Sequence, residues 1–586
     1  MDFDKATEFE DFNTILKGIL AYLRKQNCDE SMADNQEALV SEVIDFFETQ
    51  AKLKRKLLQI GIALSAEQNI EALLEMIVSE AMNFTNADGG TLYIVSHDEK
   101  SLHFKIVQNR TLNVKIGGAS GDDIPFLPVA LYKADGSKNK NNVSAYVALT
   151  GETINFSDVY EVEGFDFKGT KDYDKHNNYR SRSMLVTPMK NHEHEIIGVL
   201  QLINAGDGYG NVIPFSPDYQ FLIESLASQA AIAITNTSLI HELKALLDSF
   251  VRVIAEAVDK KSPYTGGHIR RVAELTLDIA RELCNSNDEK WENFCLNPDE
   301  ENELKIASWM HDIGKITTPE YVVDKSTKLE TIYDRINTAI AKIEIFKRDI
   351  EIKYLKKKAE LEAEHGGNGQ SALQKLDEDF AVRMEELDDD MEFLKKANIG
   401  GEFISDEKIE RIQKIASYKI TVDGKAEPIL NEEEVNNLSI RRGTLTDEER
   451  KIIMDHVVVT FKMLNQLPWP KKMKNIPLYA SEHHEKLDGT GYPNRVPAEK
   501  LSTQSRIMAI ADIFEALTAA DRPYRPGKKL SECIKIIELM VKDRHIDKDL
   551  TEFFITSEIL ARYTKKEMKE YQIDKFVYNG KEYTFL

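Results

Sequence analysis

Seven histidine and aspartate side chains carry the clearest chemical signal of this sequence. Most stand in stretches that are otherwise rich in apolar residues, where a polar side chain needs a physical reason. The seven are His268, His311, Asp312, His456, His483, His484 and Asp512. Imidazole nitrogens and carboxylate oxygens together are ligands for divalent transition metals. The set therefore indicates a metal site assembled from distant parts of the chain.

Single members of the set have ordinary explanations, but the whole set does not. His456 taken alone is typical of a surface histidine. Asp512 is harder to explain, because its neighbours Ile510, Ala511 and Ile513 are apolar. An ionised carboxylate in such surroundings needs a cation nearby, or its pKa rises.

Local patterns around these residues predict the structure that carries them. Thr446 and Glu449 form the pattern of a capping box, which predicts that the helix carrying His456 begins there. His483 and His484 precede the glycine- and proline-containing segment 489–493, whose composition predicts a turn. The pattern around residue 315 predicts that Lys315 lies one helical turn beyond His311, on the same face.

The order of these residues resembles the HD-GYP class of the HD phosphohydrolase superfamily, the bacterial hydrolases of cyclic dinucleotides. The resemblance rests on "HDIGK" at 311–315, "HHEKLDGTGYP" at 483–493 and "AIADIFEALTAADRPYR" at 509–525. It covers about 245–327 and 444–540. These motifs are highly specific, because several of them occur in the right order.

The resemblance implies a role for each matching residue. One divalent metal would be held by His268, His311, Asp312 and Asp512, and a second by His456, His483, His484 and the same Asp312. Two such cations about 3.5–4 Å apart activate a bridging hydroxide for attack on phosphorus. Iron or manganese is expected. Asp312 and Lys315 would be catalytic, and substrate contacts would come from Lys315, Gly491, Tyr492, Pro493, Arg522 and Arg525.

The sequence departs from the family pattern at a few positions. Some members have a glutamate four residues before the first histidine, which helps to bind a third metal, and here that position is Tyr264. We therefore expect two metals. Leu487 replaces a common aromatic residue and Glu515 replaces the usual aspartate. Asp488 is expected to brace the turn and not to bind metal.

The activity that the resemblance implies is hydrolysis of cyclic di-GMP to linear pGpG, and a second cleavage to GMP is left open. The motifs bind phosphate and metal, so they do not separate guanine from adenine, and the hybrid GMP–AMP cyclic dinucleotide is an open alternative. A catalytically silent cyclic-dinucleotide receptor that signals through a helical insertion is a second alternative.

The elements that must position these residues fall into several domains. We expect a multidomain protein in which an α+β GAF domain precedes an all-α HD-GYP domain interrupted by a helical hairpin, or coiled coil. The predicted divisions are a helical region at 1–51, the GAF domain at 52–216, a linking helix at 217–244, the HD-GYP domain at 245–327 and 444–586, and the insertion at 328–443.

The GAF prediction rests on "ADGGTLYIV", "GETINFSDVY" and "NYRSRSMLVTPMKNHEHEIIGVLQLINA", which resemble the usual order of this sensor module. GAF domains of cyclic-nucleotide-regulated enzymes often carry an Asn-Lys, Phe, Asp-Glu set. This chain has Asn204, Phe215 and Asp218, with Ala205 and Tyr219 in place of the lysine and glutamate. A small-molecule or cyclic-nucleotide ligand and a purely dimerising role are both open. His192 and His194 are expected in a solvated turn.

Two further stretches have the apolar spacing of long helices, one before the predicted phosphohydrolase domain and one within its predicted insertion. Apolar residues recur at helical spacing along 217–258, which could pack against its twin in a parallel homodimer. Two apolar stripes within 330–398, separated by "EHGGNGQ", predict an antiparallel helical hairpin. Residues 399–443 are expected to form a shorter helix and an irregular polar stretch.

Composition limits which other classes of protein the sequence can belong to. The 586 residues carry a formal charge of −23, which argues against a nucleic-acid polymer as partner. Four scattered cysteines without a CxxC pair argue against a disulfide framework. No apolar run approaches the roughly 20 residues of a membrane span, and the N-terminus lacks a signal-peptide pattern. The expected location is the cytoplasm.

Overall fold

The structure is a computed structural model, and its description covers residues 55, 57–64, 66–67, 69–120, 122, 124–261, 267–365, 370–520 and 527–585. The chain divides into two units, Met1–Ala245 and Leu246–Leu586, and each is described by itself. The predicted helical region at 1–51 lies outside the described residues. No helix in the described part of the chain combines the length and the apolar character that crossing a membrane requires.

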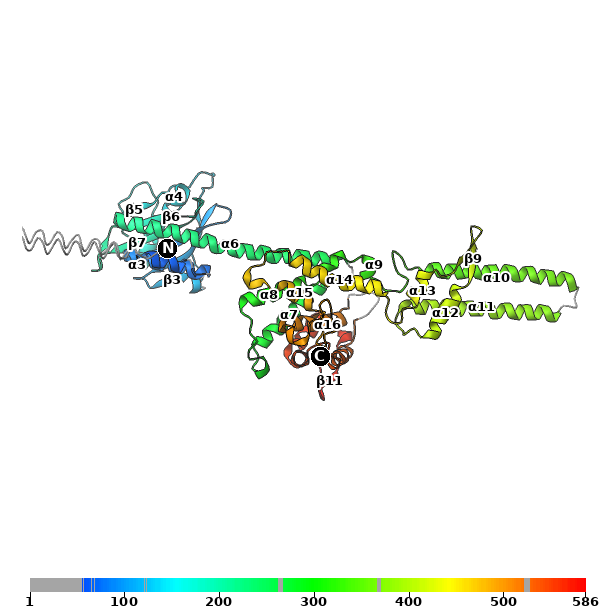
Figure 1. Cartoon of the computed structure of the whole chain (residues 1–586). Coiled ribbons are helices and arrows are strands. Elements are labelled where there is room, and N and C mark those ends of the chain that lie inside the picture. Colours follow the sequence, from blue (N-terminus) through cyan, green and yellow to red (C-terminus); the bar gives the residue numbers. More distant parts are fainter. Residues whose placement is uncertain are drawn as a thin grey trace, which may run out of the picture. The chain divides into compact units, whose positions relative to one another are not determined.

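An antiparallel sheet with the strand order β3-β2-β1-β7-β6-β5 forms the centre of the first unit (Figure 1). Its strands are β1 (Ala87–Val95), β2 (Ser101–Asn109), β3 (Val114–Gly117), β4 (Val129–Ala130), β5 (Ile154–Phe156), β6 (Met184–Lys190), β7 (Ile196–Gly206) and β8 (Val212–Ile213). Its helices are α3 (Ile70–Thr85), α4 (Val143–Thr150), α5 (Lys168–Asn177) and the first part of α6 (Pro217–Lys261). The predicted α+β class is confirmed.

Apolar periodicity explains why helices cover this sheet. Asn69 caps α3 by accepting hydrogen bonds from two backbone N–H groups, and Leu73 and Ile77 then recur at helical spacing. Both are buried with Leu226 of α6 in the core on one face of the sheet. His192 and His194 lie exposed in the turn between β6 and β7, as predicted.

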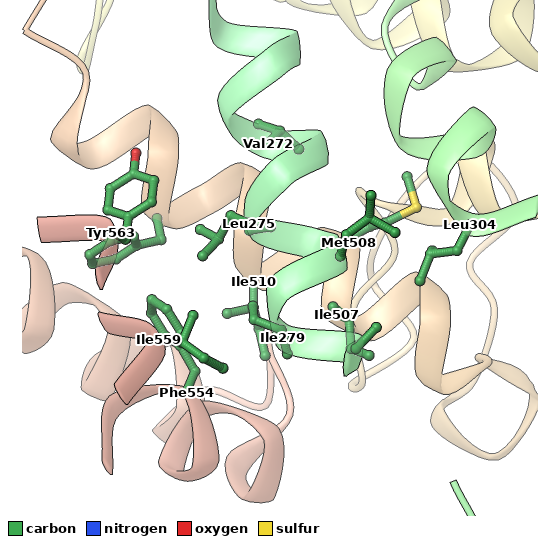
Figure 2. Packing of buried hydrophobic residues seen from close by; sticks show 14 of the residues in the cluster. Val272, Leu275, Ile279, Leu304, Ile507, Met508, Ile510, Phe554, Ile559 and Tyr563 are labelled. Carbon is green, nitrogen blue, oxygen red and sulfur yellow. The ribbon is translucent and has the colours of Figure 1, made fainter. Parts of the chain in front are cut away.

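The second unit is mainly helical. The part on either side of the predicted insertion contains α7 (His268–Cys284), α8 (Pro298–Met310), α9 (Glu320–Val323), α14 (Asp447–Leu464), α15 (Ile476–Glu482), α16 (Thr503–Thr518), α17 (Leu530–Lys542), α18 (Lys548–Thr556), α19 (Glu558–Glu567) and the hairpin β11–β12 (Phe576–Tyr578, Lys581–Tyr583). Figure 2 shows Leu275 and Ile279 of α7 packed with Ile510 of α16 and with Phe554 and Ile559 farther along the chain. This core brings segments from both sides of the predicted insertion together.

The segment predicted as an insertion has a hydrophobic core of its own. It contains α10 (Ile336–His365), α11 (Gln370–Ile399), α12 (Asp406–Ala416), β9 (Lys419–Val422), β10 (Lys425–Pro428) and α13 (Glu432–Leu438). The two long helices lie side by side (Figure 1), and the rings of Tyr354 and Phe380 stack between them at 4.1 Å. Their supercoiling and the predicted limits 328–443 stay predictions.

One expectation for this segment is wrong. The stretch predicted to be irregular contains the hairpin β9–β10, in which Asp423 and Gly424 both have positive φ. An Asp-Gly pair between two short strands favours this kind of tight turn. The sequence did not reveal these two strands, because several of their residues are charged and Ile420 is the only buried residue of the hairpin.

The separate core generates a prediction about stability. Leu394 is fully buried among α10, α11 and α12, so replacing it by alanine should destabilise this core by about 2–5 kcal/mol. Hydrogen exchange should then quicken in α10–α13 and stay unchanged in α14–α16. Lys395→Ala, at the neighbouring exposed position, is the control. Equal loss of protection in both parts would contradict two separate cores.

Candidate metal centre

All seven predicted ligand residues come together in the second unit. His268 is the first residue of α7, His311 follows the last residue of α8, and His483 follows the last residue of α15. His456 and Asp512 project from α14 and α16. Helix ends and helix faces from both sides of the predicted insertion therefore meet at one place. The capping box of Thr446 and Glu449 starts α14 as predicted.

The side chains divide into two clusters that share a carboxylate. His268, His311 and Asp512 form one group with ligand atoms within 4.8 Å of one another, and His456, His483 and His484 form another. A third group, His311, Asp312 and His483, joins a histidine of each. Asp312 lies between them: its Oδ2 is 3.5 Å from His268 Nε2, and its Oδ1 is 3.2 Å from His456 Nε2. The first two groups each contain only residues that the family resemblance assigns to one metal, and that assignment stays a prediction.

Three of the histidines hold one ring nitrogen against a backbone carbonyl and turn the other towards the centre. The Nδ1 atoms of His311 and His483 each donate to a backbone carbonyl three residues earlier, at 2.8 Å, and Nδ1 of His456 does the same. Their Nε2 atoms are buried and make no hydrogen bond, and neither does Asp312 Oδ1. Buried polar atoms normally find partners. Converging lone pairs on such atoms fit a metal ion, so the residues present suit a divalent cation.

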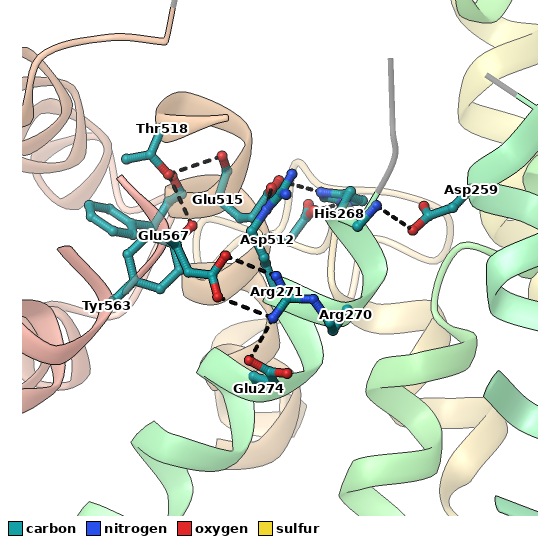
Figure 3. Close-up of polar contacts among 12 residues, drawn as sticks. Asp259, His268, Arg270, Arg271, Glu274, Asp512, Glu515, Thr518, Tyr563 and Glu567 are labelled. Atoms are coloured by element: carbon teal, nitrogen blue, oxygen red, sulfur yellow. Dashed lines mark hydrogen bonds and ion pairs between the residues drawn. The ribbon is translucent and has the colours of Figure 1, made fainter. Parts of the chain in front are cut away.

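His268 is oriented differently, through a carboxylate. Its Nδ1 hydrogen-bonds to Glu515, whose other oxygen accepts a 2.7 Å hydrogen bond from Arg271 Nε (Figure 3). Glu515 is fully buried. The arrangement turns His268 Nε2 towards Asp512 Oδ1, at 3.4 Å. A carboxylate behind a ligating imidazole fixes its ring and raises its basicity.

Burial and neighbouring charges shift the pKa values of several side chains at the centre. Burial lowers the pKa of His268, but Glu515, Asp312 and Asp512 outweigh burial and raise it above its ordinary value. Burial also lowers the pKa of His483, and that of His484 to about 4, so both imidazoles are neutral at pH 7. Burial raises the pKa of Asp312, yet Lys315 and His311 hold it well below the usual range. Neutral imidazole and ionised carboxylate are the forms that bind metal.

The prediction that Lys315 continues the helix of His311 is wrong. Helix α8 ends at Met310, and residues Ile313–Thr317 form a 3-10 turn. Lys315 Nζ lies 2.5 Å from Asp312 Oδ2, and the lysine side chain is 28% exposed. Gly314 allows this turn to pack closely against α14, since a Cβ there would come within 1.9 Å of the His456 carbonyl oxygen. The lysine therefore borders the centre from a turn packed against α14.

The last turn of α6 holds the segments beside the centre. Lys261 Nζ donates to the carbonyl oxygens of Lys315, Ile316 and Thr318. Asp259 Oδ2 accepts from the N–H of Gly267, the residue before His268. Sequence reasoning found neither contact, because lysines and aspartates at a helix end are common without any partner.

The turn after His484 lies next to that histidine. The ring of Tyr492 lies 4.8 Å from that of His484, and a Cβ on Gly491 would come within 2.4 Å of a backbone nitrogen. Asp488 is exposed and accepts from the N–H and hydroxyl of Thr490, which agrees with a bracing role. Arg522, Arg525 and Tyr264 lie outside the described residues.

The first unit contains a cavity of about 410 Å³ between its sheet and the segment that includes α4 and α5. Five aromatic residues line it: Tyr93, Phe104, Phe126, Phe167 and Tyr173. The buried Nε2 of Gln108, another lining residue, makes no hydrogen bond. Asn204 lies elsewhere and donates to Tyr179 and Arg180, while Phe215 belongs to the core on the other face. Neither contributes to this cavity.

Comparisons with known proteins match three segments of the chain. Residues 69–234 match the GAF domain family, while 265–399 and 433–550 match two HD domain families. The 3'3'-cGAMP-specific phosphodiesterase 3 of Vibrio cholerae is 37% identical over 103 residues, 18% of this chain and 22% of that protein. The cyclic di-GMP phosphodiesterase of Thermotoga maritima is 32% identical over 103 residues, 18% of this chain and 27% of that protein.

The chain thus spans about a quarter of the length of these two relatives. Among solved structures, the GAF domain/HD domain protein from Geobacter sulfurreducens covers 30% of this chain and 98% of its own, with 14% identity and a TM-score of 0.22.

The carboxylate behind His268 generates a prediction. Glu515→Ala should weaken binding of one metal equivalent about 10–100-fold, because His268 loses the group that orients it. Metal titration followed by calorimetry measures this directly, without any assay of activity. Glu567→Ala, which removes a carboxylate bound to Arg270, is the matched control. Unchanged metal affinity in Glu515→Ala, or an equal loss in both variants, would contradict the role of Glu515.

Proposed function

We propose that this chain, which carries a GAF domain followed by an HD domain of the phosphohydrolase family, is a metal-dependent phosphodiesterase that cleaves cyclic di-GMP. It would open one 3′–5′ phosphodiester to give pGpG, with GMP from a second cleavage as the alternative end product. The observation that carries the proposal is the pair of buried ligand clusters that share Asp312. The relatives named above act on cyclic dinucleotides, and their names motivate the substrate class.

The proposed ligands are the seven residues of the two clusters, holding two divalent cations with iron or manganese preferred. Such a pair, when bound, supplies Lewis acidity to the phosphoryl group and lowers the pKa of a water molecule. Asp312 would serve both cations through its two oxygens. Glu515 keeps the ring of His268 in the orientation that faces them.

The side chains around the centre would bind and orient the substrate. His484 is the most exposed of the five histidines, at 26%, so the centre opens on its side. Tyr492 covers this opening, and its ring offers a surface on which a base can stack. Lys315, at the rim, would donate to a phosphate oxygen with its ammonium group. Gly491 and Pro493 shape the same turn.

The hybrid GMP–AMP dinucleotide is the second candidate substrate, since one relative is named for this substrate and is 37% identical. A silent receptor is less well supported, because a protein that only binds nucleotide has no use for Nε2 atoms kept buried and unbonded.

We further propose that a small ligand of the GAF domain regulates the activity. A cavity of about 410 Å³ is in the usual range for a small-molecule site. Its aromatic lining favours a flat ring. The lining residues that the structure describes include Asp166 but no lysine, arginine or histidine, so the cavity disfavours anionic groups.

The substrate assignment can be tested directly. The purified chain, loaded with Mn²⁺ or Fe²⁺, should convert cyclic di-GMP to pGpG, as followed by chromatography, with the hybrid dinucleotide run beside it. Asp312→Ala should abolish turnover because it removes the carboxylate shared by both clusters. Turnover of the hybrid dinucleotide alone would make it the substrate in place of cyclic di-GMP. Turnover of neither dinucleotide with either metal would contradict the proposed activity.

Lys315 provides a second test of the same site. Lys315→Met should lower kcat by about 10²–10³-fold, the usual cost of losing one donor that stabilises developing charge. Metal content should stay at the wild-type value, since the lysine is not among the ligand residues. Lys290→Met, at an exposed ion pair, is the control. A wild-type kcat in Lys315→Met would show that the lysine takes no part in the mechanism.

A further inference from the structure

Two cysteines that the proposed mechanism does not use lie beside each other in the second unit. Cys284 is the last residue of α7, and Cys295 stands eleven positions later, shortly before α8. The Leu296 N–H donates to Cys284 Sγ at 3.1 Å, and the two cysteine side chains interact with each other. Because the Leu296 nitrogen is bonded to the carbonyl carbon of Cys295, the Cα of Cys295 lies at most about 6 Å from the Cys284 sulfur. Rotation of the Cys295 side chain can therefore bring the two sulfur atoms within bonding distance.

The loop that carries Cys295 is fixed against the core. Phe294 and Leu296, the residues on either side of Cys295, are partly buried against the core of the second unit. Asn297 then begins α8 with a capping box. Since the chain is held on both sides of Cys295, its thiol stays near the Cys284 thiol, and little conformational entropy opposes a bond between them.

The two thiols differ in their access to solvent. Cys295 is exposed, whereas Cys284 is half-buried. Burial raises the pKa of the Cys284 thiol, and the neighbouring Cys295 adds to this shift. Oxidation by peroxide follows exposure and thiolate character. The exposed Cys295 is therefore the thiol that meets an oxidant first, and Cys284 is placed to attack the oxidised sulfur.

We propose that Cys284 and Cys295 form an intrachain disulfide when the protein meets hydrogen peroxide. In the first step the Cys295 sulfur attacks one peroxide oxygen, the O–O bond breaks, and the leaving hydroxide takes up the thiol proton, which gives a sulfenic acid and water. The Cys284 sulfur then attacks the Cys295 sulfur, an S–S bond replaces the S–O bond, and the thiol proton leaves with the hydroxide as a second water. Both sulfurs are oxidised, and both peroxide oxygens are reduced to water. Such a reversible bond differs from the structural disulfide framework that the sequence argues against.

The disulfide would lie far from the metal centre. His268 begins α7 and Cys284 ends it, so the 17 residues of this helix separate the thiols from the centre by roughly 24 Å. Helix α8 leads back, because Cys295 precedes it and His311 follows it. The pair α7–α8 thus holds two ligand residues at one end and the two thiols at the other. The inference uses none of the ligand residues and is independent of the proposed activity.

Peroxide treatment of the full chain, purified with Mn²⁺, tests the proposal. After oxidation under native conditions, the remaining thiols are alkylated before unfolding, and proteolysis with mass spectrometry identifies the linked peptides. We expect a peptide pair joined through Cys284 and Cys295 that dithiothreitol separates. In Cys284→Ser the bond cannot form, and Cys295 should accumulate as a sulfenic acid that dimedone traps.

Cys533→Ser is the control for this experiment. Burial raises the pKa of the Cys533 thiol to about 12, so this thiol should not react, and the variant should form the same bond as the wild-type chain. Oxidation of Cys295 to a sulfinic acid, or its linkage to a second chain, with Cys284 left as a free thiol, would overturn the proposal.

A glutathione buffer distinguishes a prearranged pair from two unrelated thiols on one surface. At about 1 mM glutathione, the intrachain disulfide should exceed the mixed disulfide of Cys295 by about tenfold, because the effective concentration of the neighbouring thiol exceeds that of glutathione. The double variant Asn293→Cys/Cys295→Ser moves the thiol to another exposed position of the same loop and should reverse this ratio. An excess of mixed disulfide in the wild-type chain, or an unchanged ratio in the double variant, would contradict the proposal.

Discussion

The second unit has to offset the free-energy cost of burying charged groups and unpaired polar atoms at one point. Five imidazoles and three carboxylates lie together beneath a helical core, where each unpaired polar atom would cost free energy. Part of this cost is offset inside the protein. Arg271 neutralises Glu515, and Lys315 contacts Asp312. The remainder, on the inward-facing Nε2 atoms, is what a bound cation would offset.

Helix boundaries position this cluster more than helix faces do. His268 begins α7, while His311 and His483 directly follow α8 and α15. At the end of a helix, carbonyl groups lack intrahelical partners, and the imidazole Nδ1 atoms use such carbonyls to fix their rings. One contact therefore satisfies the helix end and sets the tautomer that leaves Nε2 available.

The sequence carried enough information to predict which ligand residues converge, but not how each is held. Strong signals came from residues whose chemistry is costly in apolar surroundings, such as Asp512, and from the capping pattern of Thr446. Glu515 lies three residues after Asp512 on the same helix, yet only the packing of α7 against α16 shows that it reaches His268. Lys315 was misplaced because the close approach of α14 to Gly314, a tertiary contact, overrides local helix propensity.

Helix α6 is the element through which changes elsewhere could reach the centre. Its last turn binds the backbone at Lys315 through Lys261, and the backbone before His268 through Asp259. Both contacts are direct hydrogen bonds, so rotation or translation of this turn must either break them or move the segments that they hold.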